Sequence, residues 1–210
     1  MTIPAQASWV VRKILGAVMF LSNTTGGCSI LQKNNYSISK MYYEMRGFVP
    51  SVPWRKLICN NFAPPKCMFI TWLTVHDRMV TCDNLQKIGV QCSIQCCLCD
   101  VGFDTVSHLF FNCPFSANVW GDVLQWLGIN RRPEKWENEL QFVVMKYKAK
   151  SGFHQIYRMV VSITVYLLWR ERNGRKFQQI VHTPDSVVKD IQLMIAARCY
   201  QLPKLVGLVP

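Results

Sequence analysis

Four residues in the middle of the chain could hold one metal ion. Cys96 and Cys99 form a C-x2-C pair, eight residues separate Cys99 from His108, and four separate His108 from Cys113. This spacing lets both thiolates of the pair face one centre, and the histidine and third cysteine can complete a tetrahedron. Three thiolates and one imidazole favour zinc over harder ions. Because the protein supplies all four ligands, we expect a closed, structural site for one Zn²⁺ ion rather than a catalytic site.

Other ligand sets remain open at this stage. Cys92 and Cys97 are the nearest alternatives, but Cys97 adjoins Cys96, and neighbouring side chains diverge. Cys92 would form a less usual C-x3-C pair with Cys96. We expect Cys82 and His76, which lie farther away, to be structural. A different interpretation treats the cysteines of the motif as reduced core residues beside a capping histidine.

The residues within the motif support a compact metal-binding loop, which we call the knuckle (residues 96–113). Gly102 permits a turn after the first cysteine pair, and Pro114 can begin the next helix. A structural zinc ion would contribute roughly 10 kcal/mol or more to the folding of such a loop. We expect the back of the site to be covered by the apolar residues Val106, Leu109, Phe110 and Phe111.

A second set of residues has nucleic-acid chemistry. Arg170, Arg172, Arg175 and Lys176, which we call the C-terminal basic segment, are candidates for binding phosphates. Arg172 shares a helix face with both Arg175 and Lys176, and nearby aromatic rings could stack on bases. A solvated helix end with packing aromatics would explain the same pattern. The whole chain has a formal charge of +12, which favours polyanionic partners such as RNA or DNA.

The elements that must position these residues are predicted to be mainly helical. Apolar residues recur at helical spacing, and Gly, Pro, Ser and Thr mark the ends. Ala63-Pro64-Pro65-Lys66 is an extended punctuation, and 22–37 is a loop. The predicted helices are 8–22, 38–46, 67–76, 84–88, 115–127, 135–149, 153–177 and 186–200, with a short helix or strand at 54–60.

Composition narrows the setting. With 210 residues, half of them hydrophobic, the chain suits one domain with small appendages. It contains ten cysteines but no convincing secretory signal, so we expect a reducing intracellular location, cytoplasmic or nuclear. The apolar runs Ile14–Leu21 and Met159–Trp169 are too short to span a membrane, and we interpret both as buried helix faces. We expect neither a membrane nor a small-molecule partner.

Residues 54–120 resemble the reverse-transcriptase zinc-binding domain of plant LINE-type (non-LTR) retrotransposons. The most specific part is the knuckle with His-Leu-Phe-Phe-Asn-Cys-Pro-Phe at 108–115. The segments at 36–42 and 168–177 resemble the sequences that flank this domain. The resemblance implies a mainly α-helical domain with a small irregular knuckle, zinc ligands at Cys96, Cys99, His108 and Cys113, and three regions: an N-terminal helix and loop (1–34), the zinc-binding domain (35–127) and a C-terminal helical region (128–210).

The chain departs from the family pattern at two knuckle positions. Cys97 stands where the family usually has proline, and Asp100 where glycine commonly follows the second cysteine. The family's domain belongs to a polyprotein with a polymerase, but palm-type paired aspartates, endonuclease and ribonuclease H residues are missing from this sequence. We therefore expect a detached, non-catalytic remnant rather than an enzyme.

Two functions follow from these observations. In the first, the zinc-pinned loop presents cations to nucleic acid with sequence-independent, salt-sensitive affinity. In the second, zinc only stabilises the fold. The chain is then either a structural or protein-interaction module, whose partner could be a reverse-transcriptase domain, or a transposon relic without function. The sequence is rich in apolar and aromatic residues, and only 17% of its residues are charged, which is compatible with the second function.

Overall fold

The computed structural model describes residues 8–23, 39, 42–43, 46–47, 50–59, 61–147, 149, 151–205 and 207. The chain divides into two compact units, Met1–Ser51 and Val52–Pro210. In the described part the chain is mainly helical, as predicted, and its only β-pairing is one antiparallel bridge between Gln95 and Phe103. No helix among the described residues has the length and apolar character needed to cross a membrane.

The first unit contains helix α1 (Trp9–Ser22), which confirms the helix expected at 8–22. Its apolar side chains are not a buried face, however. Trp9 is 71% exposed and Phe20 is 56% exposed, and no α1 residue with a described side chain is buried. The expectation of burial was wrong because an apolar face is buried only when another element covers it. The expected loop at 22–37 and most of the expected helix at 38–46 lie outside the described residues.

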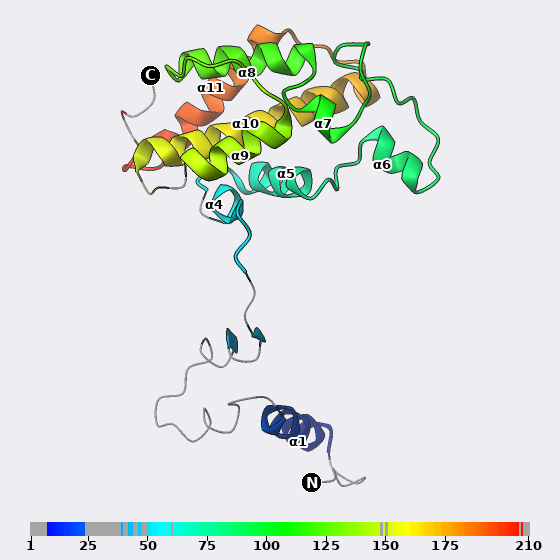
Figure 1. Cartoon of the computed structure of the whole chain (residues 1–210), viewed down its shortest axis with the longest axis vertical. Coiled ribbons are helices and arrows are strands. Elements are labelled where there is room, and N and C mark those ends of the chain that lie inside the picture. Colours follow the sequence, from blue (N-terminus) through cyan, green and yellow to red (C-terminus); the bar gives the residue numbers. More distant parts are fainter. Residues whose placement is uncertain are drawn as a thin grey trace. The chain divides into compact units, whose positions relative to one another are not determined.

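The second unit is built around the long helix α10 (Gly152–Asn173), which continues into a π-helical turn, η1 (Gly174–Gln178). Figure 1 shows α10 in the middle of this unit, with α5 (Pro65–Val75) and α11 (Pro184–Tyr200) packed on it. Helix α8 (Pro114–Trp126) packs on α11. The remaining helices are α4 (Arg55–Ile58), α6 (Cys82–Lys87), α7 (Val106–Leu109) and α9 (Trp136–Lys146).

Local sequence explains where these helices begin and end. Ser151 caps α10 by accepting a hydrogen bond from the His154 amide, and Thr183 caps α11 by accepting from Ser186. Pro65, Pro114 and Pro184 occupy first turns, where the missing N–H costs nothing. Gly128 follows α8 with a φ of +71°, a conformation that favours glycine. Apolar spacing and caps thus predicted the longer helices of this unit to within a few residues, whereas the short helix α7 was not predicted.

The apolar run at 159–169 is buried in α10, as expected, and forms the centre of the core. Buried residues from the knuckle, α8, α10 and α11 belong to one contiguous hydrophobic cluster. The core therefore extends across residue 127, where the sequence suggested a boundary between two regions. The domain boundaries at 34 and 127 stay predictions. We call α5, α8, α9, α10 and α11 the bundle.

Candidate metal centre

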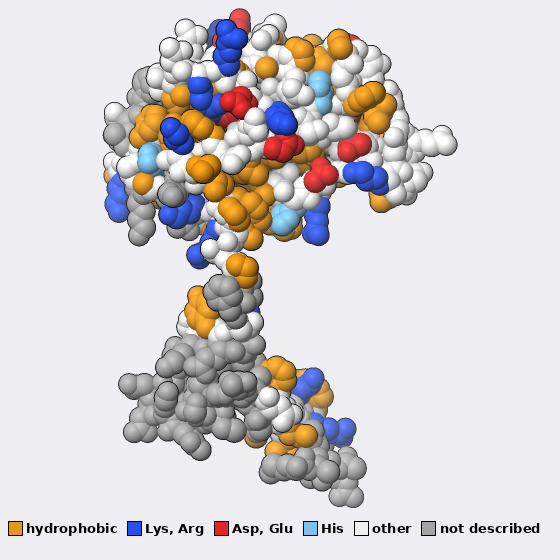
Figure 2. Space-filling view, viewed as in Figure 1, with side chains coloured by type: hydrophobic (Ala, Val, Ile, Leu, Met, Phe, Trp, Pro, Cys, Tyr) orange, Lys and Arg blue, Asp and Glu red, His pale blue; other side chains and the backbone are white. Residues whose placement is uncertain are grey.

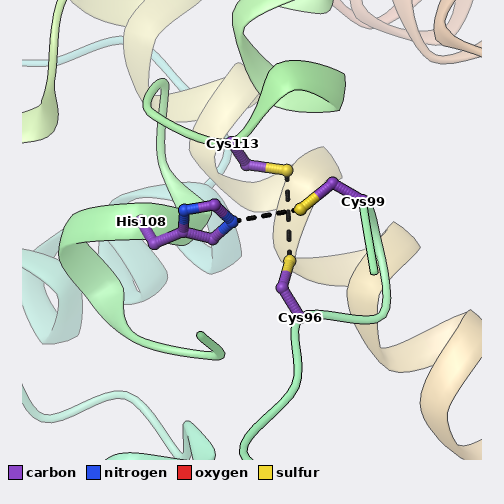
Figure 3. Close-up of side chains that lie close together, drawn as sticks. All are labelled: Cys96, Cys99, His108 and Cys113. Atoms are coloured by element: carbon purple, nitrogen blue, oxygen red, sulfur yellow. Dashed lines mark hydrogen bonds between the residues drawn. The ribbon is translucent and has the colours of Figure 1, made fainter. Parts of the chain in front are cut away.

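The structure brings together the four residues of the predicted motif. The donor atoms of Cys96, Cys99, His108 and Cys113 all lie within 4.8 Å of one another, and these residues are the only group of metal-ligating side chains found in the described part of the chain. Figure 3 shows their side chains pointing toward one centre from three separate segments. Cys96 and Cys99 come from one turn, His108 from α7, and Cys113 from the residue before α8.

The distances between these donors suit a tetrahedral ion. The Sγ atoms of Cys96 and Cys113 are 4.0 Å apart, and Cys99 Sγ is 3.2 Å from His108 Nε2. Zinc–ligand bonds of about 2.3 Å to sulfur and 2.0–2.1 Å to nitrogen place tetrahedral donors ~3.6–3.8 Å apart. The measured distances lie on either side of this range, and the donors are the soft set that selects zinc. The residues present therefore fit a structural zinc ion.

The two buried thiols of the site differ in how readily they lose a proton. The hydrogen bond between Cys96 and Cys113 lowers the pKa of Cys96 to about 5 and raises the pKa of Cys113. Two buried thiols this close share one proton more readily than they ionise together. Metal binding to such a pair releases the remaining proton, because each ligating cysteine is a thiolate.

Backbone conformation shapes the knuckle at two non-glycine positions. Asp100 has a φ of +58°, and its amide donates to the Cys96 carbonyl at 2.8 Å, which closes the C-x2-C turn. This left-handed conformation explains why glycine suits the position after the second cysteine. Phe111 has a φ of +71° and allows the Cys113 amide to donate to the His108 carbonyl at 2.7 Å.

Gly102 lies in a bend that follows the cysteine pair, as the sequence suggested, and it also has a second role. A Cβ atom at Gly102 would lie 2.1 Å from Cε1 and 2.4 Å from Nε2 of His108. The Gly102 carbonyl accepts a hydrogen bond from the Cys96 amide at 2.8 Å. Glycine at this position therefore leaves space for the imidazole beside the cysteine pair.

The apolar residues predicted to cover the site are all buried, and they join the knuckle to the bundle. Phe111 is 2% exposed, and its ring lies 4.9 Å from that of Trp120 and 6.1 Å from that of Trp136. This packing stabilises the unfavourable φ of Phe111. The other predicted members, all 5% exposed or less, are Val106, Leu109 and Phe110.

The two rival cysteines lie outside the cluster of donors. Cys97 Sγ is directed to the Arg172 carbonyl at 3.5 Å, and Cys92 Sγ to the Cys82 carbonyl at 3.6 Å. Cys82 itself is buried, with its sulfur in contact with the Lys176 ammonium. All nine described cysteines are free thiols. The structure therefore favours the predicted ligand set by geometry.

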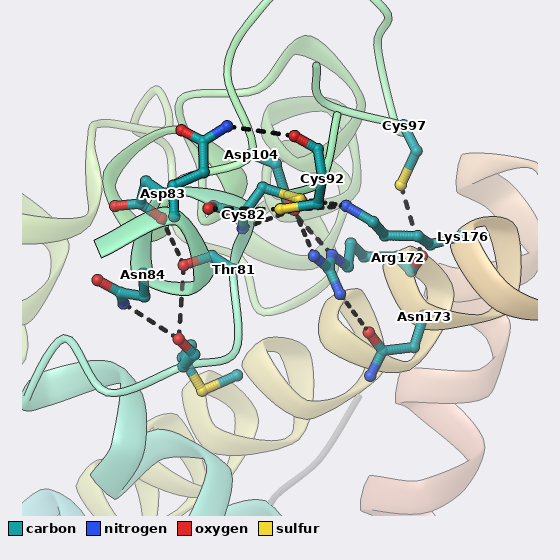
Figure 4. Close-up of polar contacts among 12 residues, drawn as sticks. Thr81, Cys82, Asp83, Asn84, Cys92, Cys97, Asp104, Arg172, Asn173 and Lys176 are labelled. Carbon is teal, nitrogen blue, oxygen red and sulfur yellow. Dashed lines mark hydrogen bonds and ion pairs between the residues drawn. The ribbon is translucent and has the colours of Figure 1, made fainter. Parts of the chain in front are cut away.

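The C-terminal basic segment packs against the knuckle, a contact that the sequence did not reveal. Arg172 is 1% exposed and forms a two-pronged ion pair with the buried carboxylate of Asp104, one prong being Nε to Oδ1 at 3.1 Å. Lys176 Nζ lies 3.2 Å from the same carboxylate, which also accepts from the Cys82 amide at 3.1 Å (Figure 4). Burial would raise the pKa of Asp104, but the hydrogen bond and charge of Arg172 outweigh it and lower that pKa.

Arg175 extends this contact to the C-x2-C turn. Its Nη1 donates to the carbonyls of Cys97 and Leu98 at 3.4 and 3.3 Å, and its Nε pairs with Glu171 at 2.8 Å. Arg170, the fourth candidate for phosphate binding, pairs with Asp190 on the surface. All four cations of the segment thus have acidic partners within the fold. Their predicted contact with nucleic acid stays a prediction.

Comparison with known proteins supports the coarser part of the resemblance, to a reverse-transcriptase zinc-binding domain. Residues 36–120 match the family model for zinc-binding in reverse transcriptase. No curated protein and no solved structure matches the chain. The matched segment contains all four converging donors but ends before α10, which supplies Arg172. The part of this chain from residue 36 to residue 120 is therefore similar to the reverse-transcriptase zinc-binding family.

Proposed function

We propose that this chain is a non-catalytic zinc-binding domain derived from the reverse transcriptase of a plant LINE-type retrotransposon, and that it contacts nucleic acid. The convergence of four protein donors within the family match carries the proposal. Four protein ligands fill a tetrahedral shell and leave no position for water or substrate. A bound ion would supply cross-links within the knuckle and would take no part in a reaction.

Each ligand has a structural task in this proposal. Cys96 and Cys99 would hold the C-x2-C turn, His108 would tie α7 to it, and Cys113 would tie the start of α8. These segments are otherwise joined by few backbone hydrogen bonds, so the ion would contribute much of the knuckle's stability. The intracellular, reducing setting follows from the same chemistry, because the ligands must stay thiolates.

Contact with nucleic acid is supported by the charge of the chain. Its 24 Lys and Arg residues outnumber 12 Asp and Glu, which favours phosphate backbones. Among the cations predicted from sequence, Arg170 is the most exposed, with 49% of its side chain accessible. Arg170 can therefore be tested without disturbing the core.

One observation favours a second candidate function, in which zinc only stabilises the fold. The chain would then be a structural or protein-interaction module, or a transposon relic without function. Three cations of the C-terminal basic segment are largely buried and paired with acidic groups: Arg172, Arg175 and Lys176. Their charge is therefore neutralised inside the fold. A reverse-transcriptase domain would be the natural protein partner. The two candidates make opposite predictions for nucleic-acid binding.

The metal is tested by elemental analysis of protein purified without chelator. We expect one zinc per chain in the wild type and its loss in Cys99→Ser. Cys97→Ser is the matched control, because Cys97 is two positions before Cys99 in the sequence and its sulfur lies outside the donor cluster. Equal zinc in both variants, or a metal-free folded wild type, would refute the proposed site.

Nucleic-acid contact is tested by a gel-shift titration with single-stranded RNA and DNA at several salt concentrations. We expect binding at low salt that weakens steeply as salt rises. If Arg170 contacts phosphate, Arg170→Gln lowers the salt dependence by about 0.7 on a double-logarithmic plot. Absence of binding at low salt would exclude this function and leave the structural module.

A further inference from the structure

Helix α5 buries small residues, half-buries most of its large ones and exposes Phe69. The side chains directed into the core are Cys67, Thr71 and Thr74, each no more than 1% exposed. Thr71 and Thr74 satisfy their hydroxyls within the helix by donating to carbonyls one turn earlier, each at 2.8 Å. Phe69, by contrast, is 57% exposed. The apolar run 67–76 by itself favours a buried helix, but Phe69 is exposed on it.

Four rings form a continuous row that begins at the exposed Phe69, and we call it the aromatic row; Phe69 and His76 are exposed, whereas Trp72 and Trp54 are half-buried. The Phe69 ring is stacked on Trp72 at 6.1 Å, Trp72 meets His76 at 5.1 Å, and His76 meets Trp54 at 5.0 Å. Phe69, Trp72 and His76 are three or four residues apart, so they share one face of α5. Trp54, just before α4, extends the row. Figure 2 shows hydrophobic side chains gathered where α4 and α5 lie, beside Lys, Arg and His.

Cations flank the aromatic row. Arg55 follows Trp54, Arg78 follows α5 by three residues, and Lys66 lies one turn before Phe69; all three are exposed. Neither Arg55 nor Arg78 has an acidic partner among the residues that the structure describes. They differ in this respect from the C-terminal basic segment, whose charges are all paired.

We propose that the aromatic row binds single-stranded nucleic acid, with bases stacked on Phe69, Trp72 and Trp54 and phosphates held by Arg55, Lys66 and Arg78. This inference rests on the proposed nucleic-acid contact and names its surface. Accessible rings interleaved with cations are the means by which proteins bind single strands without sequence preference. Here Phe69 is exposed, and Trp72 and Trp54 are partly accessible beside it. A duplex keeps its bases stacked on one another, so the row selects single strands over duplexes.

A cavity next to the row limits where the strand can lie. Trp54 lines this cavity, whose volume is about 610 Å³ and which extends to Val106 and Trp136. Its lining includes Asp77, Asp83 and Glu137. These carboxylates repel phosphate, so the backbone of a bound strand is kept out of the cavity. The charge pattern therefore favours the row itself over the cavity as the binding surface.

The first test measures affinity by fluorescence anisotropy, using the full zinc-loaded chain and labelled 20-nucleotide oligo(dT), oligo(U) and a 20-base-pair duplex. We expect the wild type to prefer both single strands. Phe69→Ala and Trp72→Ala should each weaken binding by about 10-fold. Tyr200→Ala, which removes a ring that is 86% exposed on α11, is the matched control and should bind as the wild type does.

The second test separates stacking from charge. The affinity of Arg55→Gln/Arg78→Gln should fall less steeply with salt, by about 1.4 on a double-logarithmic plot, whereas Phe69→Ala should keep the wild-type slope. Arg132→Gln, an exposed arginine in the loop before α9, is the control for charge. Phe69→Ala alone suffices if Trp72→Ala is unstable, because Phe69 is largely exposed.

The outcomes distinguish this inference from the function on which it rests. If the wild type binds single strands but the row variants bind as tightly as Tyr200→Ala, the aromatic row is overturned and nucleic-acid contact stands. If the wild type prefers the duplex, the row is overturned as well. If the wild type binds none of the three probes at low salt, both proposals fail, and the exposed rings are a surface for protein.

Discussion

The knuckle and the bundle are stabilised by different kinds of interaction. The bundle buries long apolar faces, and fourteen residues of α10 alone are buried. The knuckle contains the short helix α7 and one partner of the β-bridge between Gln95 and Phe103, and its donors converge from three segments. Apolar packing is distributed over many contacts, whereas the knuckle concentrates its stability in a few polar and metal-ligating groups. Local damage should therefore be tolerated in the bundle and severe in the knuckle.

The two regions are nevertheless physically coupled. Asp104 lies within the knuckle, and Arg172 and Lys176 lie at the end of α10 and in η1, beyond the segment that matches the zinc-binding family. Phe111 adds an apolar link to Trp120 and Trp136. The difference between the regions teaches that the knuckle's ligands are local in sequence but its support is not.

Removal of the metal should have the largest effect and should separate the two regions. Treatment with a chelator is expected to raise amide hydrogen exchange strongly across 96–113, because structural zinc contributes roughly 10 kcal/mol to such loops. The buried middle of α10 should stay protected, since its packing does not need the ion. Equal loss of protection in both regions would show that the bundle is not independent of the metal.

Arg172→Met should have the next largest effect, because it breaks the link between the regions. It leaves the buried Asp104 carboxylate with Lys176 as its remaining cation, and breaking a buried ion pair typically costs about 3–5 kcal/mol. Urea denaturation measures the free energy of unfolding. Arg170→Met is the matched control: its ion pair with Asp190 is exposed and is worth at most ~1 kcal/mol. Similar losses in the two variants would contradict the coupling.

The features that could be predicted from the sequence differ between the regions. Apolar periodicity, caps and prolines predicted the helices of the bundle to within a few residues, because these signals are local. The spacing of Cys96, Cys99, His108 and Cys113 likewise predicted the donor cluster. The pairing of Arg172 with Asp104 joins residues 68 positions apart, and no local pattern encodes such a contact. Sequence suggested an exposed cationic patch where the fold has a buried ion pair.

The same reasoning explains what was missed on α5. The run at 67–76 has apolar residues on every face of a helix, so its periodicity does not distinguish the buried face from the exposed one. Only packing against α10 shows that Thr71 and Thr74 face inward while Phe69 faces solvent. Thr71, Thr74 and Cys67 are small, which allows close approach of the two helices. Small residues at helical spacing were the signal that could have been used.

Gly102→Ala should have an intermediate effect confined to the knuckle. The added Cβ would overlap the His108 imidazole, so the ring must move away from the cysteine pair. Displacing a support of a metal ligand typically lowers metal affinity by about 10- to 100-fold. Competition with a chromogenic zinc chelator measures the change.

Gly121→Ala in α8 is the matched control for this substitution. Its Cβ would lie 3.6 Å from the nearest atom, a Pro133 carbon, which is ordinary contact. Alanine in a helix interior favours folding by up to ~1 kcal/mol over glycine. The bundle should thus accept the change that the knuckle rejects. Unchanged zinc affinity in Gly102→Ala would mean that His108 can shift without cost and is held less tightly than the distances suggest.

Asp100→Gly should have the smallest effect, and it should stabilise the knuckle. Asp100 has a φ of +58°, which costs a non-glycine residue roughly 1–2 kcal/mol, and less for aspartate. Glycine keeps the amide bond to the Cys96 carbonyl but loses about 0.5–1 kcal/mol through greater freedom in the unfolded chain. Relief of the unfavourable φ outweighs this loss, so we expect the free energy of unfolding, measured by urea denaturation, to rise by up to ~1 kcal/mol.

Asp100→Ala, which keeps a Cβ without the polar group that tolerates this conformation, should be less stable than the wild type. A glycine variant less stable than the alanine variant would show that the Asp100 side chain, not its backbone, stabilises the turn.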